Sequence, residues 1–195
     1  MKSQLNFSIK PILEGKKVVL RPFEANDWKI MIDILEDLEV KKLTGSITND
    51  EEANKTLDTS NKEKIKCWYQ SRNQQTDRLD LAIVDRETGN LIGEVVYNDF
   101  DEDTNNIYLR ILIGAAGRNR GLGTEAISLF IEYGFQVLNL HKIELEVYSF
   151  NPRAEKSYKK NGFILEGVRR ESFCYNAEYI DTKLYGMLKS DYVKR

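Results

Sequence analysis

A glycine-rich stretch in the middle of the chain has the composition of an anion-binding turn. The segment GAAGRNRGLGTEA, residues 114–126, holds four glycines, two arginines and one glutamate. It follows a β-branched apolar run and precedes an apolar run with helical spacing, which predicts a strand, a turn and a helix N-terminus. The first N–H groups of a helix lack partners, the helix dipole is positive there, and glycine lets a ligand approach closely. We therefore expect an anion, most simply a diphosphate, at this junction.

Two arginines strengthen this expectation, because a guanidinium offers charge and directed donors to phosphate oxygens. Arg118 and Arg120 both lie in the turn. Two common nucleotide motifs do not fit: Thr124 and Glu125 follow Gly123 where an ATP-binding loop has Lys-Ser/Thr, and the three-glycine spacing of a dinucleotide fingerprint is absent. ATP and NAD are therefore disfavoured. The alternative interpretation is a turn that binds nothing.

The elements that must position this turn alternate in type along the chain. Apolar alternation and helical periodicity predict strands at 16–23, 81–84, 91–97, 106–114, 142–150, 163–175 and 179–188, and helices at 25–40, within 48–73, from 122 and at 151–161. The length of 195 residues fits one domain, with residues 1–15 as an N-terminal extension.

Composition excludes several classes of function. Lys and Arg number 29 against 31 Asp and Glu, so a nucleic-acid-coating protein is disfavoured. Cys67 and Cys174 fit neither a metal site nor a disulfide framework. No run approaches the roughly eighteen apolar residues of a membrane helix. We expect a cytoplasmic protein without metal or membrane attachment, and a homodimer is compatible with the sequence.

Three segments carry a resemblance to a known family. Residues 118–123, RNRGLG, resemble the (Q/R)xxGx(G/A) acyl-CoA signature of the GNAT acetyltransferase superfamily. Residues 148–188 and the upstream VVLRPFEANDW are similar to its RimJ/RimL-type branch of ribosomal-protein and polyamine acetyltransferases, so the resemblance runs from Val18 onward. It implies an α/β fold with a mixed, mostly antiparallel sheet of about six or seven strands, splayed at a cofactor cleft, with helices on both faces.

The resemblance also implies acetyl-CoA as the cofactor and assigns residues to it. Backbone groups of the strand before the turn would pair with the pantetheine arm, and these belong to Ile111, Leu112 and Ile113. Backbone N–H groups would cradle the pyrophosphate, from Arg118, Asn119, Arg120, Gly121, Leu122, Gly123 and Thr124. Asn151 matches the asparagine that holds the cofactor arm, although an asparagine there can equally be a helix N-cap.

Tyr158 matches the family's general acid, four residues before the glycine of NGF. A coenzyme A thiolate with a pKa of about 8.5 leaves more readily when a proton donor is in place. The alternative for Tyr158 is packing on a helix face with its hydroxyl satisfied locally.

The family's general base is missing from its usual strand, where this chain has Tyr108 and Arg110. Glu94 on the preceding strand and Asp99 at that strand's end are the substitutes. The bland alternative is an outward-facing glutamate and a solvated acidic loop.

The implied reaction is N-acetylation of a primary amine by direct attack on the thioester. An α-amino group with a pKa near 7.8 is neutral in roughly one molecule in ten at pH 7, and a lysine-like amine in far fewer, so a weak base favours a peptide or protein N-terminus or an amino-acid-like amine. The acidic loop around Asp99 favours a polyamine or aminoglycoside instead. A catalytically silent acyl-CoA-binding module is the alternative of another class.

Overall fold

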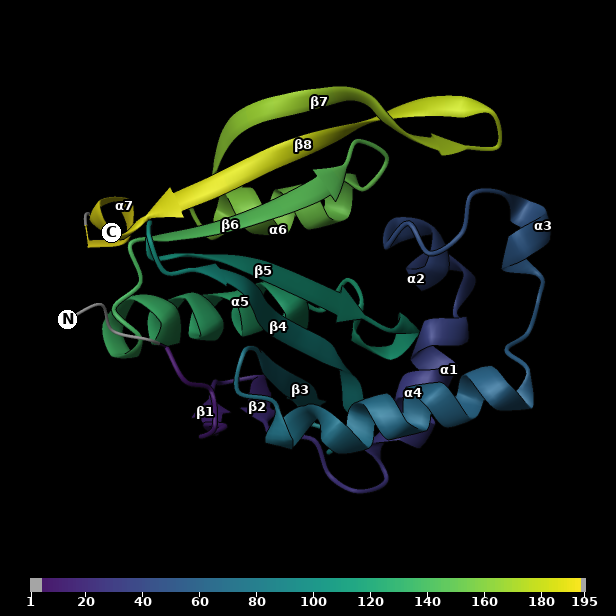
Figure 1. The fold of residues 1–195 in the computed structure, drawn as a ribbon, viewed down its shortest axis with the longest axis horizontal. Helices are drawn as coiled ribbons and strands as arrows, with labels where there is room; N and C mark the ends of the chain where they lie inside the picture. Colours follow the sequence, from purple (N-terminus) through teal and green to yellow (C-terminus); the bar gives the residue numbers. More distant parts are fainter. Residues whose placement is uncertain (1–4, 194–195) are drawn as a thin grey trace.

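An eight-stranded sheet runs through residues 5–193, the part of the chain that this computed structural model describes (Figure 1). Its strands are β1 (Leu13–Glu14), β2 (Val18–Arg21), β3 (Leu79–Asp85), β4 (Leu91–Asp101), β5 (Asn106–Ile113), β6 (Lys142–Tyr148), β7 (Ile164–Tyr175) and β8 (Glu178–Leu188). The expectation of about six or seven strands was too low. The additional strand β1 is two residues long, too short for a periodic signal in the sequence.

The sheet opens between β5 and β6, at the place where the sequence predicts a cofactor. The strand order is β1-β2-β3-β4-β5-β6-β8-β7, and β5–β6 is the parallel pair among otherwise antiparallel neighbours. Residues 106–108 of β5 pair with residues 142–144 of β6. Beyond them β5 continues to Ile113 and β6 to Tyr148 without pairing to each other. The predicted splay of a mixed sheet is therefore confirmed.

Helices cover both faces of the sheet, as expected. The helices are α1 (Asp27–Glu36), α2 (Leu38–Leu43), α3 (Asp50–Ala53), α4 (Thr59–Ser71), α5 (Leu122–Glu132), α6 (Pro152–Lys160) and α7 (Lys189–Val193). Short 3₁₀ turns occupy Arg72–Gln74 and Ala115–Gly117, and α5 continues as a π-helical turn over Tyr133–Val137. On β3, Leu81 and Ile83 join the core under α5, whereas Ala82 joins the cluster under α1 and α4, as alternation along a strand requires.

The predicted helix at 25–40 is wrong in one respect, because the structure divides it at Asp37. The Asp37 carboxylate accepts hydrogen bonds from the N–H groups of Glu39 and Val40, at 2.9 and 3.0 Å, and caps α2. This local bond competes with helix continuation. Leu38 would follow Leu35 on the apolar face of an unbroken helix, but after the division it is 55% exposed.

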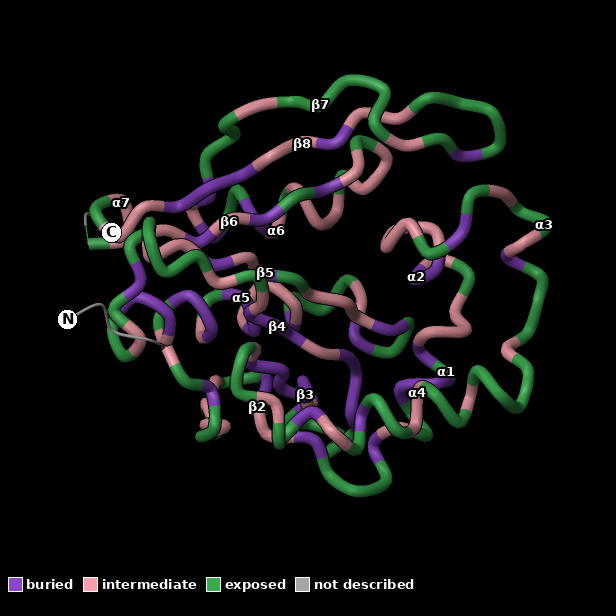
Figure 2. Tube along the Cα trace, in the orientation of Figure 1, coloured by how far each residue is buried: buried purple, intermediate pink, exposed green. Residues whose placement is uncertain are grey.

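The turns follow the residues that the sequence offers. Gly89 between β3 and β4 has φ of 71°, and Gly162 after α6 has φ of 85°. Asn176 and Ala177, both at positive φ, connect β7 to β8, and β7 is largely exposed along its length (Figure 2).

The segment expected as an N-terminal extension contributes to the core in its described part. Phe7 is 2% exposed within the main core cluster, and β1 pairs with β2. Residues 1–4 lie outside the described residues. No helix within residues 5–193 is long and apolar enough to cross a membrane.

Candidate active site

The turn after β5 has the geometry that the glycines predict. Gly121 has φ of 79° and stands at the N-cap of α5, preceded by Asn119 at φ of 61°. Any other residue at position 121 would have to adopt a backbone conformation that L-residues rarely occupy. The first turn of α5, from Leu122 to Thr124, has N–H groups without carbonyl partners from a preceding turn. These groups and the helix dipole can hold a phosphate.

Both arginines of the turn are engaged with carboxylates rather than left open to an anion. Arg118 contacts Asp37 at 2.8 Å and Glu39 at 2.7 Å. The backbone N–H of Arg118 donates to Ala115 at 3.3 Å. The direct guanidinium contribution to phosphate binding that we expected from the residue types is therefore already taken up by carboxylates of α2 and its cap.

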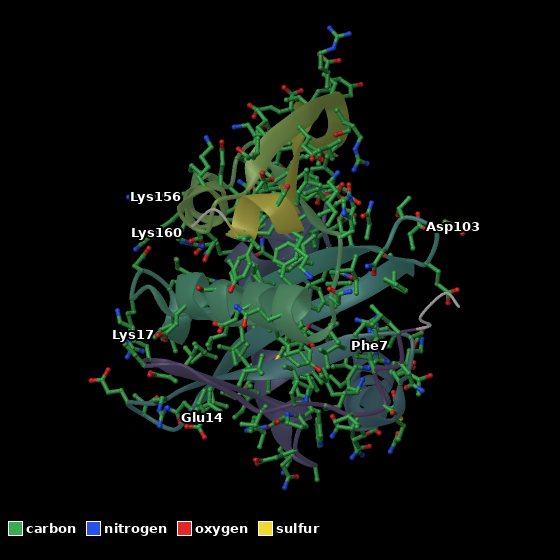
Figure 3. All side chains as sticks on the ribbon, turned by 90° about the vertical axis from the view of Figure 1, so that its left-hand side faces the viewer. Phe7, Glu14, Lys17, Asp103, Lys156 and Lys160 are labelled. Atoms are coloured by element: carbon green, nitrogen blue, oxygen red, sulfur yellow. The ribbon has the colours of Figure 1, made fainter. Side chains whose placement is uncertain are left out.

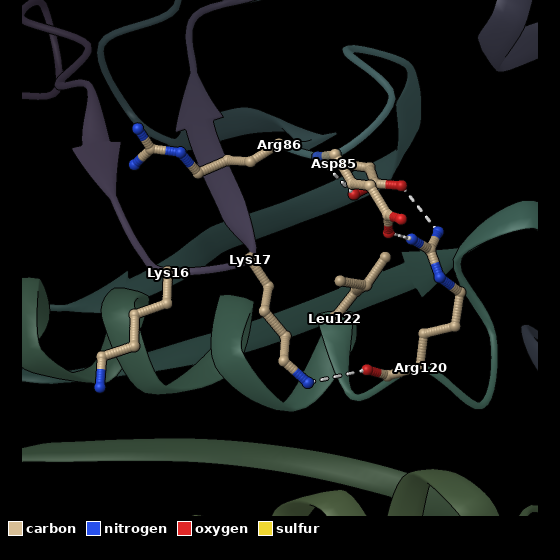
Figure 4. Close-up of a pocket in the computed structure, with 7 residues that line it drawn as sticks. Lys16, Lys17, Asp85, Arg86, Arg120 and Leu122 are labelled. Carbon is tan, nitrogen blue, oxygen red and sulfur yellow. Dashed lines mark hydrogen bonds and ion pairs between the residues drawn. The ribbon is translucent and has the colours of Figure 1, made fainter.

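Arg120 lies on the other side of the turn. It contacts Asp85 and Glu87, each at 2.7 Å. The Arg120 and Leu122 side chains line a separate pocket of about 360 Å³ with Lys17, whose ammonium donates to the Arg120 carbonyl at 3.3 Å (Figure 4). The two arginines thus fix the turn from both sides.

A cavity of about 1090 Å³ brings together the remaining predicted site residues. It follows the opening between β5 and β6 and reaches from the turn to β4. The predicted residues that line it are Glu94, Ile111, Leu112, Ile113, Arg118, Asn119, Gly121, Gly123, Thr124, Asn151 and Tyr158. Lys156 and Lys160 of α6 also line it and point outward on the same side of the molecule as Lys17 (Figure 3).

α6 carries Asn151 and Tyr158 to one wall of this cavity. The Asn151 side chain accepts a hydrogen bond from the Ala154 N–H at 3.1 Å, so in this structure Asn151 acts as the N-cap of α6. Tyr158 is 6% exposed and packs edge-on against Phe163, with ring centroids 6.1 Å apart. Burial raises the pKa of Tyr158 to about 12, so its hydroxyl keeps its proton at neutral pH.

Glu94 lies on the β4 wall with an unusual carboxyl group. Burial, and then the charge of Asp80, raise the pKa of Glu94 to about 7 despite a hydrogen bond from Tyr69. Its Oε2 atom is buried and has no hydrogen-bond partner within residues 5–193. A carboxyl group with this pKa can take up and release a proton near neutral pH.

Tyr108, at the position of the family's usual base, and Asp99, the other substitute, have different surroundings. The Tyr108 hydroxyl lies 3.2 Å from Glu146 Oε2, and burial raises the pKa of Tyr108 to about 12. Asp99 has φ of 51° near the end of β4, and its carboxylate accepts from Asn98 at 2.5 Å. Asp99 lines the cavity but is exposed.

The sequence placed no individual site residue on α4, but side chains of this helix reach the cavity. Tyr69 is 4% exposed, its ring is tilted against Phe23 with centroids 5.0 Å apart, and its side chain is hydrogen-bonded to Glu94. Trp68 lines the cavity and lies over the Arg72 guanidinium at 3.5 Å. The apolar periodicity of 48–73 indicated a helix, but no motif indicated which strand it would face. No cluster of metal-ligating side chains occurs in the described part of the chain.

Comparisons with known proteins give the site a family. A model described as an acetyltransferase (GNAT) domain matches residues 17–164. The spermidine N(1)-acetyltransferase of Vibrio cholerae is 28% identical over 149 residues, covering 70% of this chain and 86% of the relative. An uncharacterized N-acetyltransferase, p20, of Bacillus licheniformis is 25% identical over 182 residues, covering 92% of this chain and 97% of the relative.

A solved structure shares the fold. The crystal structure of spermidine N-acetyltransferase from Vibrio cholerae in complex with CoA and spermine has a TM-score of 0.76, with 24% identity and coverage of 92% of this chain and 99% of that chain. These comparisons do not favour the catalytically silent alternative, because the named relatives are N-acetyltransferases. The chain belongs to the acetyltransferase (GNAT) family and is an N-acetyltransferase.

Proposed function

We propose that this protein transfers the acetyl group of acetyl-CoA to a primary amine by direct attack, with Glu94 as general base and Tyr158 as general acid. The observation that carries the proposal is the cavity that joins these two groups to the turn before α5. Glu94, with its pKa of about 7, stands at one wall, and the protonated Tyr158 stands at another.

The residues present fit acetyl-CoA. The edge of β5 beyond Tyr108 is unpaired on the β6 side, so its backbone groups at 111–113 are available to an amide-bearing arm. The N–H groups at the start of α5 suit a pyrophosphate. Acetyl-CoA supplies an electrophilic thioester carbonyl there, and this chain's residues orient it and handle the protons.

The pKa values of Glu94 and Tyr158 support one sequence of proton transfers. Glu94 accepts a proton from the acceptor ammonium and leaves a neutral amine, whose nitrogen lone pair forms the C–N bond. The C–S bond breaks, and Tyr158 donates its proton to the departing sulfur. The amide nitrogen releases a second proton that restores the hydroxyl, so one proton remains on the thiol and one leaves through Glu94. Positioning and proton transfer together suffice without a covalent enzyme intermediate.

The acceptor has two candidate classes. A base with a pKa of about 7 handles an α-amine more easily than a polyamine, which supports a protein N-terminus or an amino-acid-like amine. The acidic residues at the end of β4 and the spermidine acetyltransferases among the relatives support a polyamine. Free, exposed Cys67 and Cys174 suit the cytoplasm as the compartment.

Coenzyme A release tests this function directly. The purified protein and acetyl-CoA are incubated with N-terminal peptides, amino acids, polyamines or aminoglycosides, and a thiol reagent measures release after correction for Cys67 and Cys174. Amine-dependent release with acetylated product by mass spectrometry supports the proposal. Absence of release with every acceptor, although acetyl-CoA binds by calorimetry, would contradict it.

A further inference from the structure

Arg110 is a cation of the main cavity whose guanidinium makes no contact that holds the described part of the chain together. It lies on β5, is exposed, and lines the main cavity. Within residues 5–193 the structure gives its side chain no hydrogen bond and no ion pair. An arginine fork without a protein partner, facing a cavity, is available to a planar anion such as a carboxylate.

The other arginines of the cavity differ from Arg110 in this respect. Arg78 makes a two-point contact with Asp80, at 2.8 and 2.7 Å. Arg118 is held by α2, and Arg153 contacts Glu39 at 2.5 Å. Each of these guanidinium groups already meets a carboxylate of the chain, so Arg110 is the one placed to meet a carboxylate brought by the substrate.

The register of the sheet places Arg110 next to the proposed base. Arg110 pairs with Val96, and Glu94 pairs with Leu112, so Glu94 and Arg110 are diagonal neighbours on one face, about 7–8 Å apart at the backbone. The Arg110 charge acts on Glu94 and opposes the rise of its pKa. When the amine of a substrate lies at Glu94, a second group a few atoms away on the same substrate can therefore reach the Arg110 guanidinium.

The carboxylates near Arg110 do not offset this charge fully. Glu146 is ion-paired with Arg169 and accepts from Tyr108, and Glu94 is partly protonated at neutral pH. Asp99 lies three residues beyond Val96 and is hydrogen-bonded to Asn98. A fully cationic polyamine would meet an uncompensated guanidinium beside the base.

We propose that Arg110 is a specificity residue that binds a carboxylate of the acceptor, so that the enzyme prefers amines that carry a carboxylate, such as amino acids, over polyamines. This inference rests on the proposed function, since it concerns the acceptor of the same reaction. It assigns to Arg110 a role in binding and no role in proton transfer.

Matched acceptors test the contact. Steady-state coenzyme A release is measured for an amino acid, its amide and spermidine, with wild type, Arg110→Gln, Arg110→Lys, Arg110→Glu and the control Lys64→Gln. Lys64 is an exposed cation of the same cavity on α4. Its replacement therefore shows the effect of removing one positive charge from the cavity at a position other than Arg110. Comparing the acid-to-amide ratio of kcat/KM between enzymes cancels the different amine pKa values of the two substrates.

We expect wild type to prefer the amino acid over its amide and over spermidine. Arg110→Gln should lower the acid-to-amide ratio by about 10- to 100-fold, mainly through KM, because one charge-assisted contact is lost. Arg110→Lys should retain part of the preference, Lys64→Gln should retain it fully, and Arg110→Glu should shift the preference toward spermidine.

The outcomes separate this inference from the proposed function. A ratio that Arg110→Gln leaves unchanged, an equal fall with Lys64→Gln, or wild-type turnover confined to amines without a carboxylate would overturn the role of Arg110 while leaving the acetyltransferase intact. Absence of amine-dependent release by wild type would overturn both. Arg110→Lys guards against misfolding of the glutamine variant, and circular dichroism checks each protein.

Discussion

The replacement of Glu94 by glutamine should stabilise the protein and disable it at the same time. The difference between a pKa of about 7 and the ordinary 4.5 corresponds to about 3 kcal/mol of folding free energy. Because the folded-state pKa is raised, the stabilising contribution of the protonated carboxyl is fully present below about pH 4.5 and is lost as the pH rises through about 7. Glutamine has the shape of the neutral acid at every pH.

The magnitude depends on pH in a way that isolates Glu94. The free energy of unfolding of Glu94→Gln should exceed that of wild type by about 1 kcal/mol at pH 5 and by about 3 kcal/mol at pH 8. Urea unfolding followed by the fluorescence of Trp28 and Trp68 measures both values. Glu146→Gln is the matched control, since it removes an ion-paired carboxylate from the same cavity and should give no such gain.

The same variant should lose activity. Wild-type kcat/KM should rise about tenfold from pH 6 to a plateau above about pH 8, as a carboxyl of pKa about 7 ionises. Glu94→Gln should lower the plateau by about a hundredfold or more and remove this inflection. Near-normal turnover would refute the role of general base, and equal stability at pH 8 would refute the raised pKa.

Two further variants test the acid and the anion-binding turn. Tyr158→Phe should lower kcat by about a hundredfold with unchanged acetyl-CoA affinity by calorimetry; near-normal kcat would leave Tyr158 a packing residue. Gly121→Leu should abolish acetyl-CoA binding and cost about 1–2 kcal/mol of stability, because φ is 79° there. Gly89→Leu, at φ of 71° in open space, carries a similar backbone cost and should bind normally, so equal affinities of these two variants would contradict a pyrophosphate at Gly121.

Glycines at turns and changes in apolar spacing predicted several turns and helix boundaries of the fold. The positive φ values of Gly89 and Gly162 follow from turn and helix-end positions that the neighbouring residues indicate. The boundary at Leu122 follows from the change from glycines to helical periodicity. The helix division at Asp37 was not predicted. An aspartate within a helical apolar pattern can either continue the helix or cap a new one, and tertiary contacts decide between the two.

The site was predictable in its backbone and less so in its charges. The glycine turn and the unpaired part of β5 come from adjacent residues and from the family resemblance. The pKa of Glu94 depends on Asp80 and Tyr69, which belong to other elements, and no spacing in the sequence encodes their approach. The partners of Arg118 likewise lie about 80 positions away, at Asp37 and Glu39.

The ion pairs of the two arginines also determine whether the turn can keep its conformation outside this protein. Arg118 and Arg120 fasten residues 114–126 to α2 and to the β3–β4 turn, so the loss of backbone freedom occurs when the protein folds and not when the cofactor arrives. An isolated peptide with the same thirteen residues would lack the carboxylate partners of both arginines, so its ligand would have to order it. The anion-binding turn is thus a property of the whole domain, and grafting it onto another scaffold requires the acidic residues that hold it as well as the glycines.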